Sequence, residues 1–134
     1  MSSLLVRDVM AKHPPAIAEG TPLTDVVDTL LRHKLTGLPV IDSDEQVVGF
    51  VSEQDCLRSM LVSSYHAEGS PKVEDVMRRD PLTIGLDRSV VDIAEQMVKQ
   101  KPKVYPVVDD RHRLVGLLVR SQVLTALKNN RGST

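Results

Sequence analysis

The sequence predicts a mixed α/β fold of the α+β class, built from one β-α-β-β-α unit that occurs twice. The first observation is an internal repeat, because Val6–Leu61 aligns without a gap over Val73–Lys128. The second is that each copy shows an apolar pattern of helical period followed by two short runs rich in Val, Leu and Ile. The third is the length of 134 residues, which fits one compact domain or two small units that share a core.

The repeat is clearest in three short stretches. VRDVM at residue 6 returns as VEDVM at residue 73, LPVID at 38 returns as YPVVD at 105, and VGF at 48 returns as VGL at 115. Two copies indicate a pseudo-symmetric pair, since a solenoid needs more repeats. The expected organisation is a first copy over residues 1–62, a polar linker over 63–72, a second copy over 73–130 and a frayed end over 131–134.

The first copy predicts its elements in order. A short amphipathic turn leads through a proline to an extended piece around Ile17. A helix follows, in which we expect Thr21 as the N-cap, Pro22 as the first helical residue and Gly37 at the exit. Two strands joined by a polar turn, then a second helix, complete the copy, at residues 38–41, 47–51 and 52–63.

The second copy predicts the same order. Its extended piece lies around Ile84, and apolar residues at helical spacing form the face of its first helix. These are Val90, Ile93, Ala94, Met97 and Val98. The strands and the final helix are expected at residues 104–108, 114–118 and 119–128.

Composition excludes several classes of protein. A formal net charge of -1 provides no field that would attract nucleic acid or an anionic membrane, and 2% aromatic residues are too few for base stacking. No apolar run approaches the roughly 20 residues that span a bilayer, and the N-terminus lacks the pattern of a secretory signal. The single cysteine, Cys56, excludes an internal disulfide and fits a reducing compartment. We therefore expect a cytoplasmic protein without membrane insertion or a nucleic-acid partner.

No group of residues predicts catalysis or a metal site. Cys56 aligns with Val123 in the repeat, which favours a buried small apolar residue. The histidines show no metal-ligand spacing, and the acidic runs at Asp42 and Asp109 fall in hairpin turns, where Asp is favoured for its geometry. No phosphate loop or nucleophile-base set is present. The expectation is a protein that is not an enzyme, with no catalytic residues, no metal and no required cofactor.

The ordered motifs are similar to those of a known family. The first copy reads VRDVM, GLPVID and GFVSEQDCLR, and the second reads VEDVM, VYPVVDD and GLLVRSQVL. This set resembles the cystathionine β-synthase (CBS) domain pair over nearly the whole chain. The resemblance implies two CBS motifs packed through their sheets as a pseudo-twofold pair, a Bateman module. It also implies a homodimer, an adenosine nucleotide bound in the cleft between the motifs, and regulation of partner proteins without catalysis.

The resemblance further implies which residues bind the nucleotide. The family carries Gly-hydrophobic-x-Ser/Thr-x-x-Asp at the end of its third strand, and GFVSEQD matches this pattern. Asp55 would accept hydrogen bonds from the ribose hydroxyls, because an ionised carboxylate only accepts. Ser52, at a helix N-terminus, would lie near the phosphate. The adenine would lie beside Ala16, Ile17 and Ala18 of the first extended piece, and the opposite wall would be formed by Gly37, Leu38 and Pro39.

Ser52 and Asp55 also have a purely structural interpretation. A serine followed three residues later by an acidic residue, at the start of a helix, is the pattern of an N-cap. Both groups also interact favourably with the helix dipole. The capping role and the nucleotide-binding role are compatible, and the sequence leaves both open.

The second copy departs from the family pattern. Val119 replaces the serine, and Gln122, with a neutral amide, replaces the aspartate. Arg120, Lys103 and Tyr105 are candidates for a second site near that position, and the two cations could contact a phosphate or simply be solvated. We therefore expect one standard nucleotide site in the first copy and a doubtful one in the second.

Two functions follow from these observations. The first is a stand-alone regulatory module that binds AMP, ADP or ATP and signals to an effector protein in trans. The alternative is a ligand-free module for dimerisation or protein interaction, which the altered second copy supports. The apolar residues of the two final helices offer surface for such contacts, namely Leu57, Met60, Leu61, Val123, Leu124 and Leu127.

Overall fold

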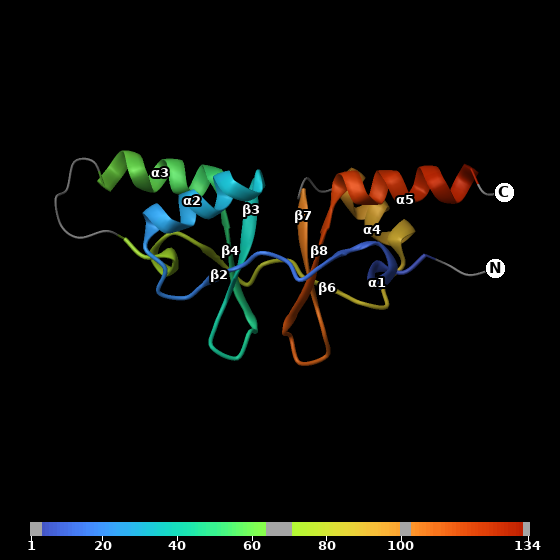
Figure 1. Ribbon diagram of the computed structural model, residues 1–134, viewed down its shortest axis with the longest axis horizontal. Helices are drawn as coiled ribbons and strands as arrows, with labels where there is room; N and C mark the ends of the chain where they lie inside the picture. The colour runs from blue at the N-terminus through green and yellow to red at the C-terminus, as the bar shows by residue number, and fades with distance from the viewer. Residues whose placement is uncertain (1–3, 64–70, 100–102, 133–134) are drawn as a thin grey trace. The chain divides into compact units, whose positions relative to one another are not determined.

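The computed structural model describes residues 4–63, 71–99 and 103–132. The chain divides into two compact units. The central unit is Pro15–Pro81, and the terminal unit joins Met1–Pro14 to Leu82–Thr134. Each unit contains a four-stranded sheet and its own helices (Figure 1).

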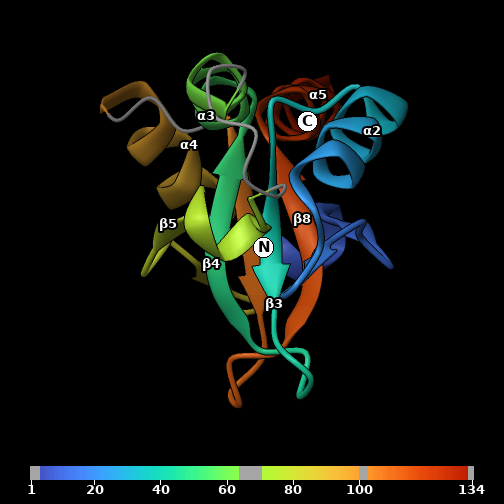
Figure 2. The ribbon, with the colours of Figure 1, turned by 90° about the vertical axis from the view of Figure 1, so that its left-hand side faces the viewer.

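The sheet of the central unit has the strand order β2-β3-β4-β5. Strand β2 runs parallel to β3, whereas β4 is antiparallel to both of its neighbours. Helices α2 and α3 lie toward the strand ends that are far from the β3–β4 turn (Figure 2). The elements are β2 (Ile17–Ala18), α2 (Leu23–His33), β3 (Gly37–Ile41), β4 (Val47–Ser52), α3 (Glu53–Ser63), the 3-10 helix η1 (Val73–Asp75) and β5 (Arg78–Arg79).

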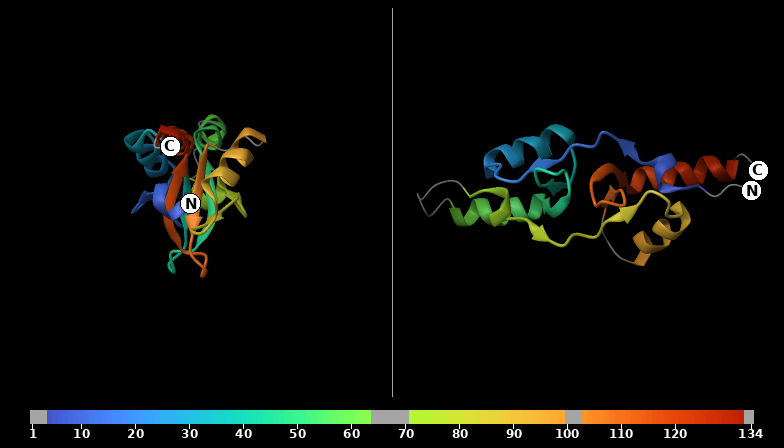
Figure 3. Two further views of the ribbon diagram at one scale, coloured as in Figure 1. Left: turned by 90° about the vertical axis from the view of Figure 1, so that its right-hand side faces the viewer. Right: turned by 90° about the horizontal axis from the view of Figure 1, so that it is seen from below.

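The sheet of the terminal unit has the strand order β1-β8-β7-β6, with the same pattern of directions. Helices α4 and α5 again lie away from the hairpin turn, here that of β7 and β8 (Figure 3). The elements are α1 (Val6–Val9), β1 (Ala11–Lys12), β6 (Ile84–Gly85), α4 (Val90–Lys99), β7 (Val104–Val108), β8 (Leu114–Val119) and α5 (Arg120–Gly132).

The predicted fold class is confirmed, since the β-α-β-β-α order occurs twice. Strand β7 has the bounds that its apolar run predicts, and α5 continues beyond the expected Lys128 to Gly132. Leu23, Val26 and Leu30 are buried in α2, and Val90 and Ile93 in α4, as their spacing indicates. Val98 was predicted for the same face of α4, but it is 86% exposed. Most of the expected linker, residues 64–70, lies outside the described residues.

The ends of α2 differ from the prediction. Pro22 has an extended ψ of 149° and precedes the helix, so Thr21 lies too early to cap it. The Thr21 hydroxyl instead donates to the Ala18 carbonyl at 2.6 Å. The helix ends at His33, and its C-cap Lys34 takes the left-handed conformation (φ 55°), so Gly37 is not the exit residue. Gly37 begins β3, where the Phe50 ring occupies the space that a Cβ would need.

A methionine packed on a glycine recurs in both units. The Met77 sulfur lies where a Cβ on Gly49 would project, and the Met10 sulfur lies in the same way over Gly116. In each case the short edge strand passes close by, since the Arg78 and Ala11 carbonyl oxygens would lie 3.0 Å from a Cβ on the glycine beside them. The need for a bare backbone at this crossing explains why Gly and Met occur in both copies.

The compact units do not follow the repeat boundaries. Strand β1 belongs to the first copy by sequence, yet it pairs with β8 through Ala11 and Leu117. Strand β5, from the start of the second copy, pairs with β4 through Arg78 and Phe50. Each unit therefore takes its edge strand from the sequence that opens the other copy. The chain passes between units at two matched prolines, Pro14 and Pro81.

Candidate functional site

The junction of β4 and α3 holds the polar pair that the sequence singled out. The Ser52 backbone N–H and hydroxyl both donate to the Asp55 Oδ2 atom, at 3.0 and 2.8 Å, and the Asp55 N–H donates to the Ser52 Oγ atom at 3.2 Å. This reciprocal arrangement is a capping box. Asp55 is only 4% exposed and is the one charged residue buried within the described part of the chain. Ser52 and Asp55 therefore do cap the N-terminus of α3, as the structural interpretation of the sequence predicts.

The second carboxylate oxygen of Asp55 faces two guanidinium groups. Arg58 Nη1 lies 3.6 Å from Oδ1, and Arg78 Nε lies 3.7 Å from the same atom. Arg58 comes from the first turns of α3, whereas Arg78 is brought in by the pairing of β5 with β4. Sequence reasoning missed both arginines. The spacing of three residues from Asp55 could have revealed Arg58, but no local signal points to Arg78.

The two segments predicted to contact the adenine lie on different strands, and only one of these strands is next to β4. Gly37 is directly opposite Ser52 in the β3–β4 pair, and Leu38 and Pro39 follow on the same strand. All three are buried. The extended piece at residues 16–18 lies beyond β3, because Ile17 pairs with Val40 on the edge that does not face β4. The structure thus brings Gly37 beside Ser52, while Ala16, Ile17 and Ala18 are one strand further away.

The matching junction in the terminal unit keeps only part of the cap. The Val119 N–H donates to the Gln122 Oε1 atom at 2.9 Å, but valine supplies no hydroxyl. The Arg120 N–H donates to the Lys103 carbonyl oxygen at 3.3 Å, which places these two exposed residues side by side. Tyr105 lies elsewhere, fully buried in the apolar core of this unit. Its hydroxyl has no hydrogen-bond partner among the described residues, and burial raises its pKa.

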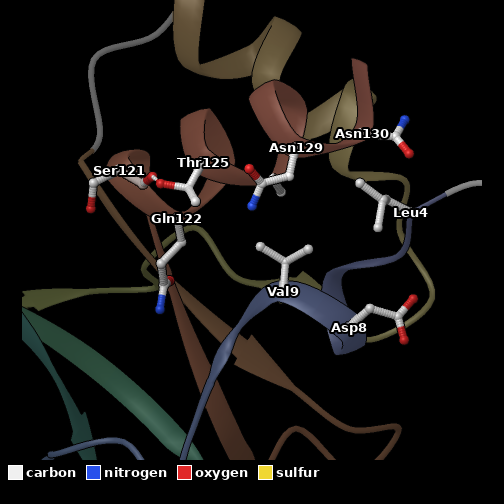
Figure 4. A pocket seen from close by; sticks show the side chains of 9 residues that line it. Leu4, Asp8, Val9, Ser121, Gln122, Thr125, Asn129 and Asn130 are labelled. Carbon is white, nitrogen blue, oxygen red and sulfur yellow. Dashed lines mark hydrogen bonds between the residues drawn. The ribbon is translucent and has the colours of Figure 1, made fainter. Parts of the chain in front are cut away.

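A pocket of about 560 Å³ opens beside Gln122 within the terminal unit. Helix α5 forms one side and the segment at α1 forms the other (Figure 4). Amide, hydroxyl and apolar groups line it, together with one carboxylate, and no lysine or arginine is among the described residues of the lining. These are Leu4, Asp8, Val9, Ser121, Gln122, Thr125, Ala126, Asn129 and Asn130. These described residues offer hydrogen bonds and one negative charge.

The remaining candidate residues have structural roles. In the hairpin turns, Asp42 Oδ1 accepts the N–H groups of Asp44 and Gln46, and Asp109 Oδ1 accepts those of Arg111 and Arg113. These bonds are the turn geometry that the acidic runs indicated. In residues 4–63, 71–99 and 103–132, no group of three or more His, Cys, Asp or Glu is placed to hold a metal ion.

Cys56 is buried in α3, as its alignment with Val123 indicated. Burial raises the pKa of its thiol, and the negative charges of Asp55 and Glu53 raise it further. A neutral thiol is a poor nucleophile.

Among the helices of the described residues, none is both long and apolar enough to cross a bilayer.

Comparison with known proteins defines the class. The CBS domain profile matches residues 6–62 and 73–129, one match for each copy of the repeat. The chain belongs to the CBS domain family and contains a tandem pair of these domains.

Two solved structures show the same fold with ligands. CBSX2 of Arabidopsis thaliana, solved in complex with AMP, has a TM-score of 0.83 and 30% identity, and the match covers 95% of this chain and 98% of that one. The CBS domain pair of protein MJ0100, solved with 5′-methylthioadenosine and S-adenosyl-L-methionine, has a TM-score of 0.78 and 25% identity, with 96% and 99% covered. Pairs of this fold therefore bind adenosine compounds that differ in charge.

Some relatives of this chain have about the same length, and others are much longer. An uncharacterized protein of Methanocaldococcus jannaschii is 29% identical, and the match covers 92% of this chain and 91% of the relative. The L-aspartate semialdehyde sulfurtransferase of the same organism is 26% identical over 89% of this chain, but the match covers only 22% of that enzyme. The chain spans about a fifth of such longer relatives.

Proposed function

We propose that this protein is a regulatory CBS pair that binds an adenosine nucleotide, AMP, ADP or ATP, at the β4–α3 junction of its central unit. It acts in the cytoplasm as a homodimer, has no catalysis of its own and signals to an effector protein in trans. The ligand shifts an equilibrium between states that bind it with different affinity, and the effector responds to that shift.

The environment of Asp55 carries this proposal. A carboxylate that is 4% exposed needs hydrogen-bond donors, and Ser52 supplies them to one oxygen only. The other oxygen faces two guanidinium groups at distances beyond normal hydrogen bonding. Two ribose hydroxyls would supply the missing donors there. The AMP complex of CBSX2, a neighbour with 30% identity, supports an adenosine ligand.

Calorimetric titration with AMP, ADP, ATP and adenosine tests the proposal. We expect binding to the unmodified protein and a loss of more than about tenfold in affinity for Asp55→Asn, since hydrogen bonds to charged groups contribute about 1.5–3 kcal/mol. The matched control is Gln122→Ala, which alters the equivalent position of the other copy. Unchanged affinity in Asp55→Asn, or no binding of any adenosine compound, would show that the site is wrongly assigned.

A ligand-free interaction module is the second candidate function. Leu57, Met60 and Leu61 are 61%, 44% and 67% exposed along α3, and Leu124 of α5 is 70% exposed. Val123 of α5 offers no such surface, because it is buried in the core. Sedimentation of Leu57→Glu against the unmodified protein tests whether the exposed residues of α3 form a homodimer. A dimer that dissociates in Leu57→Glu, with no nucleotide binding, would favour this function.

A further inference from the structure

The formal net charge of -1 is the sum of two large and opposite charges, one on each compact unit. The chain has 18 acidic and 17 basic residues; the central unit, Pro15–Pro81, carries 12 acidic and 6 basic ones, and the terminal unit carries 6 and 11. The central unit therefore has a formal charge of -6 and the terminal unit one of +5. Surfaces of opposite charge favour association, and surfaces of like charge oppose it.

Helices α3 and α5 expose apolar side chains at matching positions. Leu57 of α3 and Leu124 of α5 are partners in the repeat, and both are largely exposed. On α3 the apolar surface continues one turn later through Leu61, which is also exposed. Removing such side chains from water is favourable, so both helices gain from a partner that covers them.

The residues beside these two leucines differ in charge between the helices. One turn before the leucine, α3 has Glu53 and α5 has Arg120. One turn after it, α3 has Leu61 and α5 has Lys128. All four side chains are exposed, and residues four apart lie on one side of a helix. The row on α3 is therefore acidic and apolar, whereas the row on α5 is basic at both ends.

The other charged residues of the two helices keep this difference. In α3, Asp55 is buried in the helix cap, and Arg58 is exposed and approaches it. In α5 the remaining charged residue is Arg131, and the helix contains no acidic residue. The formal charge is thus -1 for α3 and +3 for α5.

A second copy of the chain can cover these helices in two ways. In a like-to-like dimer, α3 lies against α3 and α5 against α5, so units of equal charge meet, and Arg120 and Lys128 approach the same two cations of the other copy. In a crossed dimer, α3 lies against α5, and Glu53 meets one of these cations whichever way the helices run. Both arrangements bury the same leucines, so the charges decide between them.

We infer that two copies of this chain pair crosswise, with α3 of each copy against α5 of the other. This inference rests on the homodimer of the proposed function and adds its orientation. Twofold symmetry makes the contact occur twice. Each acidic central unit, which carries the candidate site at Asp55, then faces the basic terminal unit of the second copy.

Disulfide cross-linking tests the orientation. The background is Cys56→Val, because Cys56 is the single cysteine of the chain. Leu57→Cys and Leu124→Cys are made separately in this background and oxidised alone and as a mixture. We expect covalent dimers in the mixture and several-fold fewer in either protein alone. The control is a mixture of Leu31→Cys with Leu124→Cys, since Leu31 is an exposed leucine of α2.

Sedimentation equilibrium tests the role of charge. We expect Arg120→Glu combined with Lys128→Glu to weaken the dimer about three- to tenfold, because exposed ion pairs contribute modestly and each occurs twice. Adding Glu53→Lys should restore part of the affinity, and KCl should weaken the unmodified dimer. The control is Arg88→Glu combined with Lys99→Glu, which changes the charge of the terminal unit equally outside α5 and should weaken the dimer less.

The outcomes separate the orientation from the proposed function. Covalent dimers of Leu57→Cys alone, as abundant as those of the mixture, would overturn the crossed arrangement while the homodimer stands. A dimer that is strengthened by the two glutamates on α5 would do the same, because only the like-to-like arrangement is relieved by them. If the unmodified protein is a monomer at every concentration, the homodimer and its orientation are both overturned, whereas nucleotide binding is judged separately by calorimetry.

Discussion

One oxygen of the Asp55 carboxylate accepts both the backbone N–H and the hydroxyl of Ser52. That oxygen fixes the first turn of α3, and the other oxygen is directed toward Arg58 and Arg78. A single buried carboxylate thus has a structural role on one side and a proposed ligand-binding role on the other. The two roles can be separated experimentally, because they depend on different atoms.

The capping role predicts a loss of stability in the absence of any ligand. Asp55→Ala removes both bonds to Ser52, so we expect it to lower the free energy of unfolding by about 1–2 kcal/mol. Gln122→Ala, which removes a single bond from the matching cap, should cost about half as much. Urea denaturation of the two variants measures both values. Equal costs would contradict the difference between the caps.

The buried hydroxyl of Tyr105 predicts a substitution without cost. The residue is fully buried and its hydroxyl lacks a partner among the described residues, so the group is desolvated without compensation. Tyr105→Phe should leave the free energy of unfolding unchanged or raise it by about 1 kcal/mol. Leu38, an apolar residue, holds the matching position in the central unit. A measured loss of more than about 1 kcal/mol would reveal a hydrogen bond to this hydroxyl.

The buried thiol of Cys56 predicts a lower free energy of unfolding at alkaline pH. Burial, with the charges of Asp55 and Glu53, raises its pKa above the ordinary value of 9.0. As the pH rises, the thiol therefore loses its proton in the unfolded chain before it does so in the folded protein. The contribution of this group to the free energy of unfolding is fully present below the pKa of the unfolded chain, and it is lost as the pH rises through the pKa of the folded protein. Cys56→Val, the residue of the other copy, should remove this decline and otherwise change stability by less than about 1.5 kcal/mol. Urea denaturation between about pH 8 and 10 follows both effects. A decline that persists unchanged in Cys56→Val would assign it to another group.

The contact of methionine with glycine predicts a steric effect. In Gly49→Ala the new methyl group would meet the Met77 sulfur and the nearby Arg78 carbonyl oxygen, and β5 must shift. We expect a loss of about 1–3 kcal/mol. Gly116→Ala should behave alike, because Met10 and Ala11 occupy the same places. Gly85→Ala is the control, since no atom lies within 4 Å of its added Cβ. Similar unfolding midpoints for all three variants would refute the explanation.

The sequence predicted those parts of the fold that depend on local patterns. The apolar run at residues 104–108 forms a strand with the expected bounds, and the repeat transferred that assignment to residues 38–41 with one residue added at the start. The Ser52 and Asp55 cap was predicted for the same reason, because its two members are three residues apart. Lys34 as the C-cap of α2 was missed, since a left-handed lysine has no distinctive sequence signal.

The arginines of the candidate site could not be predicted from local sequence. Arg78 reaches Asp55 only because the two-residue strand β5 pairs with β4, and a strand of that length has no detectable periodicity. Tyr105 was misleading for a related reason. It follows Lys103 closely along the chain, but it lies on a buried strand and is directed into the core.

The pairing of β1 with β8 has a consequence for how the protein folds during synthesis. The central unit is a continuous stretch of chain and can fold as soon as residue 81 has left the ribosome. Ala11, in contrast, must wait for Leu117, which is synthesised more than a hundred residues later. A strand that is made early is thus among the last to find its partner, and the terminal unit is completed only after the central unit has had time to fold.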